Sequence, residues 1–145
     1  MFGKRKNSLL IPTNEHFDTL IGKTSEFRGN LLLGESLRLD GKIVGNIESD
    51  PITKVTVAIG EDGEVVGDIC AYRVMVAGKV EGNINAVERV ELHKTAQIRG
   101  DVTYGSIGIE HGAKIVGLVI QGVDKHSANH ASEVIKTAKD GSNLF

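Results

Sequence analysis

Apolar and polar residues alternate with a period of two through most of the chain from residue 37 to residue 119. The intervening positions are mostly Glu, Lys, Arg, Asn, Asp and Thr. Such alternation predicts β-strands with one buried face, and the β-branched Val and Ile residues that dominate the apolar positions favour strands. One run of apolar residues and glycines at a single parity is Leu37, Leu39, Gly41, Ile43, Gly45 and Ile47.

A short motif, apolar-x-Gly-x-apolar, occurs six times within this region. Its glycines are 15 to 22 residues apart, and the longest interval contains Ser49–Lys54, which we interpret as a loop insertion. These intervals are too short for β-α-β units, which need about 30 residues. A fixed register instead favours stacked equivalent coils, as in a parallel β-helix. The motif glycines are Gly29, Gly45, Gly67, Gly82, Gly100 and Gly117.

Each coil is expected to contain three short strands, and the chain about six coils. Two columns of the motif should then point inward, and the glycine between them should form a corner where a Cβ is unwelcome or φ is positive. The Asn or Asp that follows most of these glycines is interpreted as a corner residue rather than a metal-binding ladder. The columns are Phe27, Ile43, Val65, Val80, Ile98 and Ile115, and Leu31, Ile47, Ile69, Ile84, Val102 and Val119.

The two terminal coils are more apolar than the middle ones. Leu118 stands where the other coils have Asn or Asp, and Leu31–Leu33 replaces alternation in the first coil. Exposed sheet edges pair readily with other chains. The sequence leaves two interpretations open, end-to-end association or tails that fold over the ends. A weak helical stripe at residues 131–138 belongs to a C-terminal tail that we expect to be flexible.

The first six residues combine apolar Met1 and Phe2 with basic Lys4, Arg5 and Lys6. This combination suits weak attachment to anionic lipid, although an ordinary solvated chain start is also compatible with it. No apolar stretch approaches the ~18 residues of a transmembrane helix or the length of a secretory signal. We therefore expect a cytoplasmic protein.

The repeat region resembles the bactofilins, a family of bacterial cytoskeletal proteins. The resemblance rests on the sixfold Gly-Asn/Asp-Ile/Val pattern, on residues 39–47 and on the basic N-terminal start. It implies an all-β, right-handed parallel β-helix over residues 17–124, with flexible tails at 1–16 and 125–145. It also implies filaments without polarity, assembled without nucleotide through like ends.

The resemblance assigns functional residues to both ends and to the N-terminus. Membrane binding at the inner face of the cytoplasmic membrane maps onto Met1, Phe2, Lys4, Arg5 and Lys6. Cell-wall enzymes and polarity proteins are the implied partners beside the chain itself. The polymerisation contacts map onto Phe27, Leu31, Leu33, Ile115, Leu118, Val119 and Ile120.

The main alternative is a hexapeptide-type β-helix enzyme, an acyltransferase or a zinc carbonic anhydrase. Catalytic zinc needs three protein ligands, and the predicted register aligns His93 with Glu110 rather than with His111. A net charge of −2 argues against nucleic acid, and a single cysteine, Cys70, excludes a disulfide framework. No Gly-rich phosphate loop occurs. We therefore predict a non-enzymatic protein with no catalytic residues, metal or cofactor.

Overall fold

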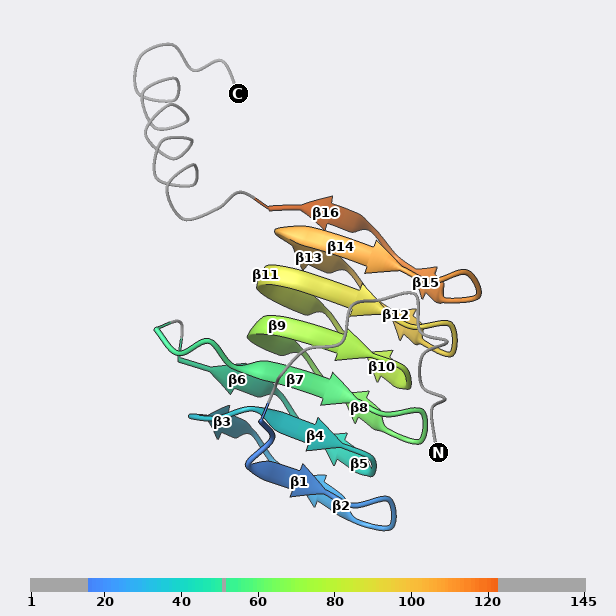
Figure 1. Ribbon diagram of the computed structural model, residues 1–145. Helices are drawn as coiled ribbons and strands as arrows, with labels where there is room; N and C mark the ends of the chain where they lie inside the picture. The colour runs from blue at the N-terminus through green and yellow to red at the C-terminus, as the bar shows by residue number, and fades with distance from the viewer. Residues whose placement is uncertain (1–15, 51, 123–145) are drawn as a thin grey trace, which may run out of the picture.

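The computed structural model describes residues 16–50 and 52–122 and is a parallel β-solenoid of six coils (Figure 1). The expected tails, with the N-terminal basic residues and the stripe at 131–138, fall mostly or wholly outside these residues. No helix of the length and apolarity of a membrane span occurs within them. The strands are β1 (Thr19–Ile21), β2 (Glu26–Arg28), β3 (Leu31–Leu33), β4 (Leu37–Leu39), β5 (Lys42–Val44), β6 (Ile47–Ser49), β7 (Thr56–Ile59), β8 (Glu64–Val66), β9 (Ile69–Val76), β10 (Lys79–Glu81), β11 (Ile84–Leu92), β12 (Gln97–Arg99), β13 (Val102–Tyr104), β14 (Ser106–Ile109), β15 (Lys114–Val116) and β16 (Val119–Gln121).

Every strand pairs in parallel with its equivalent in the neighbouring coil. One sheet follows the order β15-β12-β10-β8-β5-β2, and the other includes the path β1-β4-β7-β9-β11-β13-β16. The long strands β9 and β11 each bend and serve two successive coils. The chain winds as a right-handed coil from β1 at one end to β16 at the other (Figure 1).

Both predicted inward columns are confirmed by the strand register. Phe27 pairs with Ile43, and Ile43 with Val65, and the column continues in step to Ile115. The four middle members of this column are at most 1% exposed. Full burial of a Val or Ile side chain is worth about 1.5–3 kcal/mol, so these columns contribute much of the stability.

The motif glycines form the corner between the two inward columns. Their φ angles lie between 136° and 152°, a conformation that side chains with a Cβ rarely adopt. A Cβ at any of the five later glycines would also clash with the carbonyl oxygen of the glycine one coil before. Both the conformation and the space therefore require glycine.

The polar residue after each glycine connects neighbouring coils. The Oδ1 atom of Asn30 accepts a hydrogen bond from the backbone N–H of Asn46, and Asn46 accepts one from Asp68 in the same way. The series continues to Leu118 at donor–acceptor distances of 2.9–3.0 Å. We call this series the corner ladder; its role is structural, as the sequence indicated.

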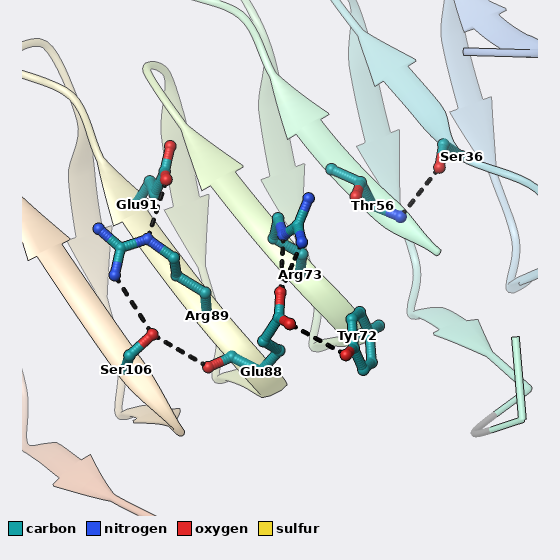
Figure 2. Close-up of polar contacts among 8 residues, drawn as sticks. All are labelled: Ser36, Thr56, Tyr72, Arg73, Glu88, Arg89, Glu91 and Ser106. Carbon is teal, nitrogen blue, oxygen red and sulfur yellow. Dashed lines mark hydrogen bonds and ion pairs between the residues drawn. The ribbon is translucent and has the colours of Figure 1, made fainter. Parts of the chain in front are cut away.

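The corner between the third and first strands of successive coils varies in length, and polar side chains gather there (Figure 2). Two side chains donate hydrogen bonds to the Glu88 carboxylate. The Tyr72 hydroxyl lies 3.0 Å from Glu88 Oε2, and Arg73 Nη2 lies 2.6 Å from Glu88 Oε1. Burial alone would raise the pKa of Glu88. The hydrogen bonds from Arg73 and Tyr72 and the nearby positive charge have a larger effect together, so the pKa is lowered. The same hydrogen bond to Glu88 raises the pKa of Tyr72.

Replacement of Gly82 by Ala tests the glycine corner. The new Cβ would clash with the Gly67 carbonyl and would force a strained φ of 151°, so we expect a loss of at least ~1–3 kcal/mol in the free energy of unfolding. Thermal unfolding followed by circular dichroism measures the loss. Gly22→Ala is the matched control, because nothing lies within 4 Å of the point where its Cβ would stand. Equal melting temperatures for both variants would contradict the corner argument.

Replacement of Glu88 by Gln tests the polar cluster. Because the folded state lowers the pKa of Glu88, its contribution is present above its ordinary pKa and is lost as the pH falls through the lowered value. We expect Glu88→Gln to cost up to ~1 kcal/mol at pH 7, since the pair is partly exposed. The difference from the parent should shrink near pH 3. A penalty that does not change with pH would exclude this ionic contribution.

Candidate assembly surfaces

The hydrophobic core is open at the C-terminal end of the solenoid. Val119 occupies the same inward column as Val102, yet it is 42% exposed whereas Val102 is fully buried. Ile109 is half exposed, although Leu92, its partner one coil earlier, is buried. These residues are exposed because no further coil covers them in the described part of the chain, and we call this end, where the core is uncovered, a cut face of the core.

Outward-pointing apolar residues surround this cut face. Leu118 is 64% exposed, and Val116 and Ile120 lie beside it with exposed side chains. Together with the inward residues they form the C-terminal apolar end. Its members are Ile107, Ile109, Ala113, Ile115, Val116, Leu118, Val119 and Ile120.

The N-terminal end is open in the same way but carries more charge. Ile21, Phe27 and Leu31 are only partly buried, and Leu20 and Leu32 are exposed beside them. These five residues form the N-terminal apolar end. Its uncovered core matches that of the opposite end.

Charged side chains lie close to this end. Glu26 accepts a hydrogen bond from Arg28, and this bond and charge lower its pKa. Glu35 shares a hydrogen bond with Asp18, which raises the pKa of Glu35. This end therefore mixes apolar and ionic contacts.

The seven residues predicted for polymerisation are distributed unevenly. Leu118, Val119 and Ile120 are exposed, and Phe27, Leu31 and Ile115 are half-buried members of the open columns. Leu33 is only 4% exposed and packs in the core, so it is removed from the candidate surface.

Sequence reasoning did not select several exposed apolar residues at the ends. Leu20, Leu32, Ile109 and Val116 belong to the end surfaces by position and exposure. The signal was available, because each belongs to the first or last coil of the repeat.

The corner ladder also ends at the C-terminal end. Leu118 donates its backbone N–H to Asp101, but its own side chain has no acceptor for a following coil. At the other end, Asn30 begins the ladder in the first coil. The two ends are therefore chemically unequal at this corner.

The groups that an enzyme would use are dispersed. The His93 Nδ1 atom lies 3.5 Å from Glu110 Oε1, as the predicted register required. Within the described residues, no three His, Cys, Asp or Glu side chains group as metal ligands would. Burial, followed by Glu48 and Asp68, raises the pKa of the Cys70 thiol, which disfavours the nucleophilic thiolate. Cys70 borders a hollow of about 280 Å³ with a mostly apolar lining.

Comparison with known proteins agrees with this geometry. The family described as "Bactofilin: Polymer-forming cytoskeletal" matches residues 19–119, which include nearly all of the solenoid. The chain belongs to the bactofilin family. Its membership identifies it as a polymer-forming cytoskeletal protein, and the fold expected from the resemblance is confirmed.

Two bactofilins of Myxococcus xanthus (strain DK1622) are similar to the chain. Bactofilin BacO is 32% identical over 102 residues, which are 70% of this chain and 78% of BacO. Bactofilin BacP is 30% identical over 105 residues, 72% of this chain but only 42% of BacP. No solved structure matches the chain.

Proposed function

We propose that this bactofilin is a non-enzymatic scaffold that polymerises end to end, without nucleotide, into filaments that lack polarity. The filaments lie on the inner face of the cytoplasmic membrane and organise cell-wall enzymes or polarity proteins. The observation that carries the proposal is the open hydrophobic core at both ends of the solenoid. Contact with a second copy buries this surface and removes the exposed strand edges.

Contacts between like ends are supported by the corner ladder. If the N-terminal end of one copy stacked on the C-terminal end of another, the Asn30 N–H would face Leu118, which offers no side-chain acceptor. Two C-terminal ends related by a two-fold axis instead place apolar residues against apolar residues. Leu118 therefore disfavours continuation of the coil and favours a symmetric joint.

Leu118→Arg tests this joint. The symmetric contact would lose two leucines, one from each copy, and would gain two like charges. The lost burial alone is worth about 3 kcal/mol, or roughly a 100-fold weaker contact. Negative-stain electron microscopy without nucleotide should show filaments for the parent and short particles for the variant.

Asn85→Arg is the matched control. Asn85 is exposed but lies in a middle coil, so its replacement should leave the filaments unchanged. If Leu118→Arg still formed filaments, the polymer contact would have to lie elsewhere than at the C-terminal end. If the parent formed only single particles, polymerisation through the open ends would be contradicted.

Attachment to the membrane is proposed for Met1, Phe2, Lys4, Arg5 and Lys6. Two apolar side chains and three cations suit an anionic surface, where each cation contributes about 1 kcal/mol. One copy binds weakly, but a filament presents many copies at once. Polymerisation and membrane attachment thus reinforce each other.

Combined replacement of Lys4, Arg5 and Lys6 by Gln tests the attachment. Loss of three cations should weaken binding per copy by about 3 kcal/mol, or roughly 100-fold. Co-sedimentation with vesicles that contain anionic lipid measures binding, and neutral vesicles are the control. Filaments should persist in micrographs of the same sample. Undiminished sedimentation with anionic vesicles would contradict the assignment.

A further inference from the structure

One outer face of the solenoid is more shielded than its position explains. Ala58, Met75, Glu91 and Gly108 share one outward register position on β7, β9, β11 and β14. Ala58 is only 5% exposed and Glu91 only 4%, whereas Leu20 and Arg38, which hold the same register position in the first two coils, are exposed. The first halves of β9 and β11 provide a comparison, because they form another part of the same sheet. There the outward residue Asn85, in a middle coil, is exposed. We call the four residues, together with Thr56, the shielded face.

Of the two register partners of Glu91, Met75 on β9 can cover it from within the sheet, but the partner on the other side cannot. Gly108 occupies the equivalent position in the following coil and has no side chain to lay over the carboxylate. Arg89 donates from Nε to Glu91 Oε2 at 2.9 Å (Figure 2), but Arg89 is itself a third exposed. A glutamate at such a position on an uncovered sheet would be exposed to solvent.

Two polar atoms on this face lack partners in the described part of the chain. Glu91 Oε1 and Thr56 Oγ1 are both buried without a hydrogen bond there. Burial of an unpaired acceptor costs about 1–3 kcal/mol, and more for a charged group. The face therefore calls for a covering segment that supplies hydrogen-bond donors, and for a carboxylate the best donors are cationic.

We propose that the shielded face is the docking site of this chain's own N-terminal segment, residues 4–11. The described chain begins at His16, directly before β1, and β1 belongs to the same sheet as β7, β9 and β11. The apolar residues Leu9–Ile11 are nearer to His16 in the sequence, and the basic residues Lys4–Lys6 are farther from it. Ala58 and Met75 lie in the third and fourth coils, and Glu91 lies in the fifth.

The order and the reach of the segment both fit. Coils are about 4.8 Å apart, so the fifth coil lies about 19 Å from the first. The ten residue-to-residue steps from His16 back to Lys6 span up to about 33 Å when extended. Leu9–Ile11 can therefore cover Ala58 and Met75, and a cation from Lys4–Lys6 can donate to Glu91 Oε1.

Thiol labelling tests the docking. In a Cys70→Ser background, Ala58→Cys should react with iodoacetamide at least about tenfold more slowly in the full chain than in a chain that lacks residues 2–13. Asn85→Cys is the exposed control and should react equally fast in both chains. Circular dichroism verifies that each variant is folded. Met75→Cys provides a second site if Ala58→Cys does not fold.

A disulfide trap identifies the occupant. With Leu10→Cys and Ala58→Cys in the Cys70→Ser background, mild oxidation should yield a cross-link within one chain, seen as a faster monomer band on a non-reducing gel. A dimer band would assign the face to a second copy and overturn the proposal. Equal labelling of Ala58→Cys in both chains would overturn it as well, because neighbouring side chains would then provide the shielding. Both assays are run without lipid, so they do not depend on the membrane proposal.

Discussion

The close approach of the backbone at the glycine corner is the constraint on which the structure depends. Each motif glycine after the first occupies the space above the carbonyl oxygen of the glycine one coil earlier, so the coils can stack there in only one register. This register aligns every other position, including the inward columns and the corner ladder. The hydrophobic effect supplies the stability, but the glycine corner decides which residues share a column.

The same register explains why core residues are exposed at both ends. The inward positions of a middle coil and of a terminal coil both carry apolar side chains, but in the middle coil they are covered on both sides. Val102 and Val119 are chemically identical members of one column, yet only Val102 is fully buried. Between residues 16 and 122 no polar cap covers either end, so the core is exposed twice in the described part of the chain, and Leu118 removes the acceptor that would let the second end accept a further coil in register.

The sequence predicted those features that recur at a fixed offset from the glycines. The columns, the three strands per coil and the pairing of His93 with Glu110 all follow from that offset. The cluster around Glu88 was not predicted, because the corner that carries it varies in length: β9 and β11 run through it without a break, whereas a longer connection joins β6 to β7. The burial of Ala58 and Glu91 was also missed, since strand alternation describes one chain segment and says nothing of what lies over it. Leu33, which has the inward parity of Leu31, packs in the core instead of at the end surface.

The basic residues near the N-terminus have two possible anionic partners, the Glu91 carboxylate and a lipid surface. The contact with Glu91 lies within one chain, so its effective concentration is the same in a single copy and in a filament. Lipid binding instead strengthens with the number of copies that face the membrane together. The balance therefore shifts toward lipid as filaments grow. The two proposals together therefore predict that the segment favours its own solenoid in a short particle and the membrane in a long filament, so that polymerisation would commit the protein to the surface.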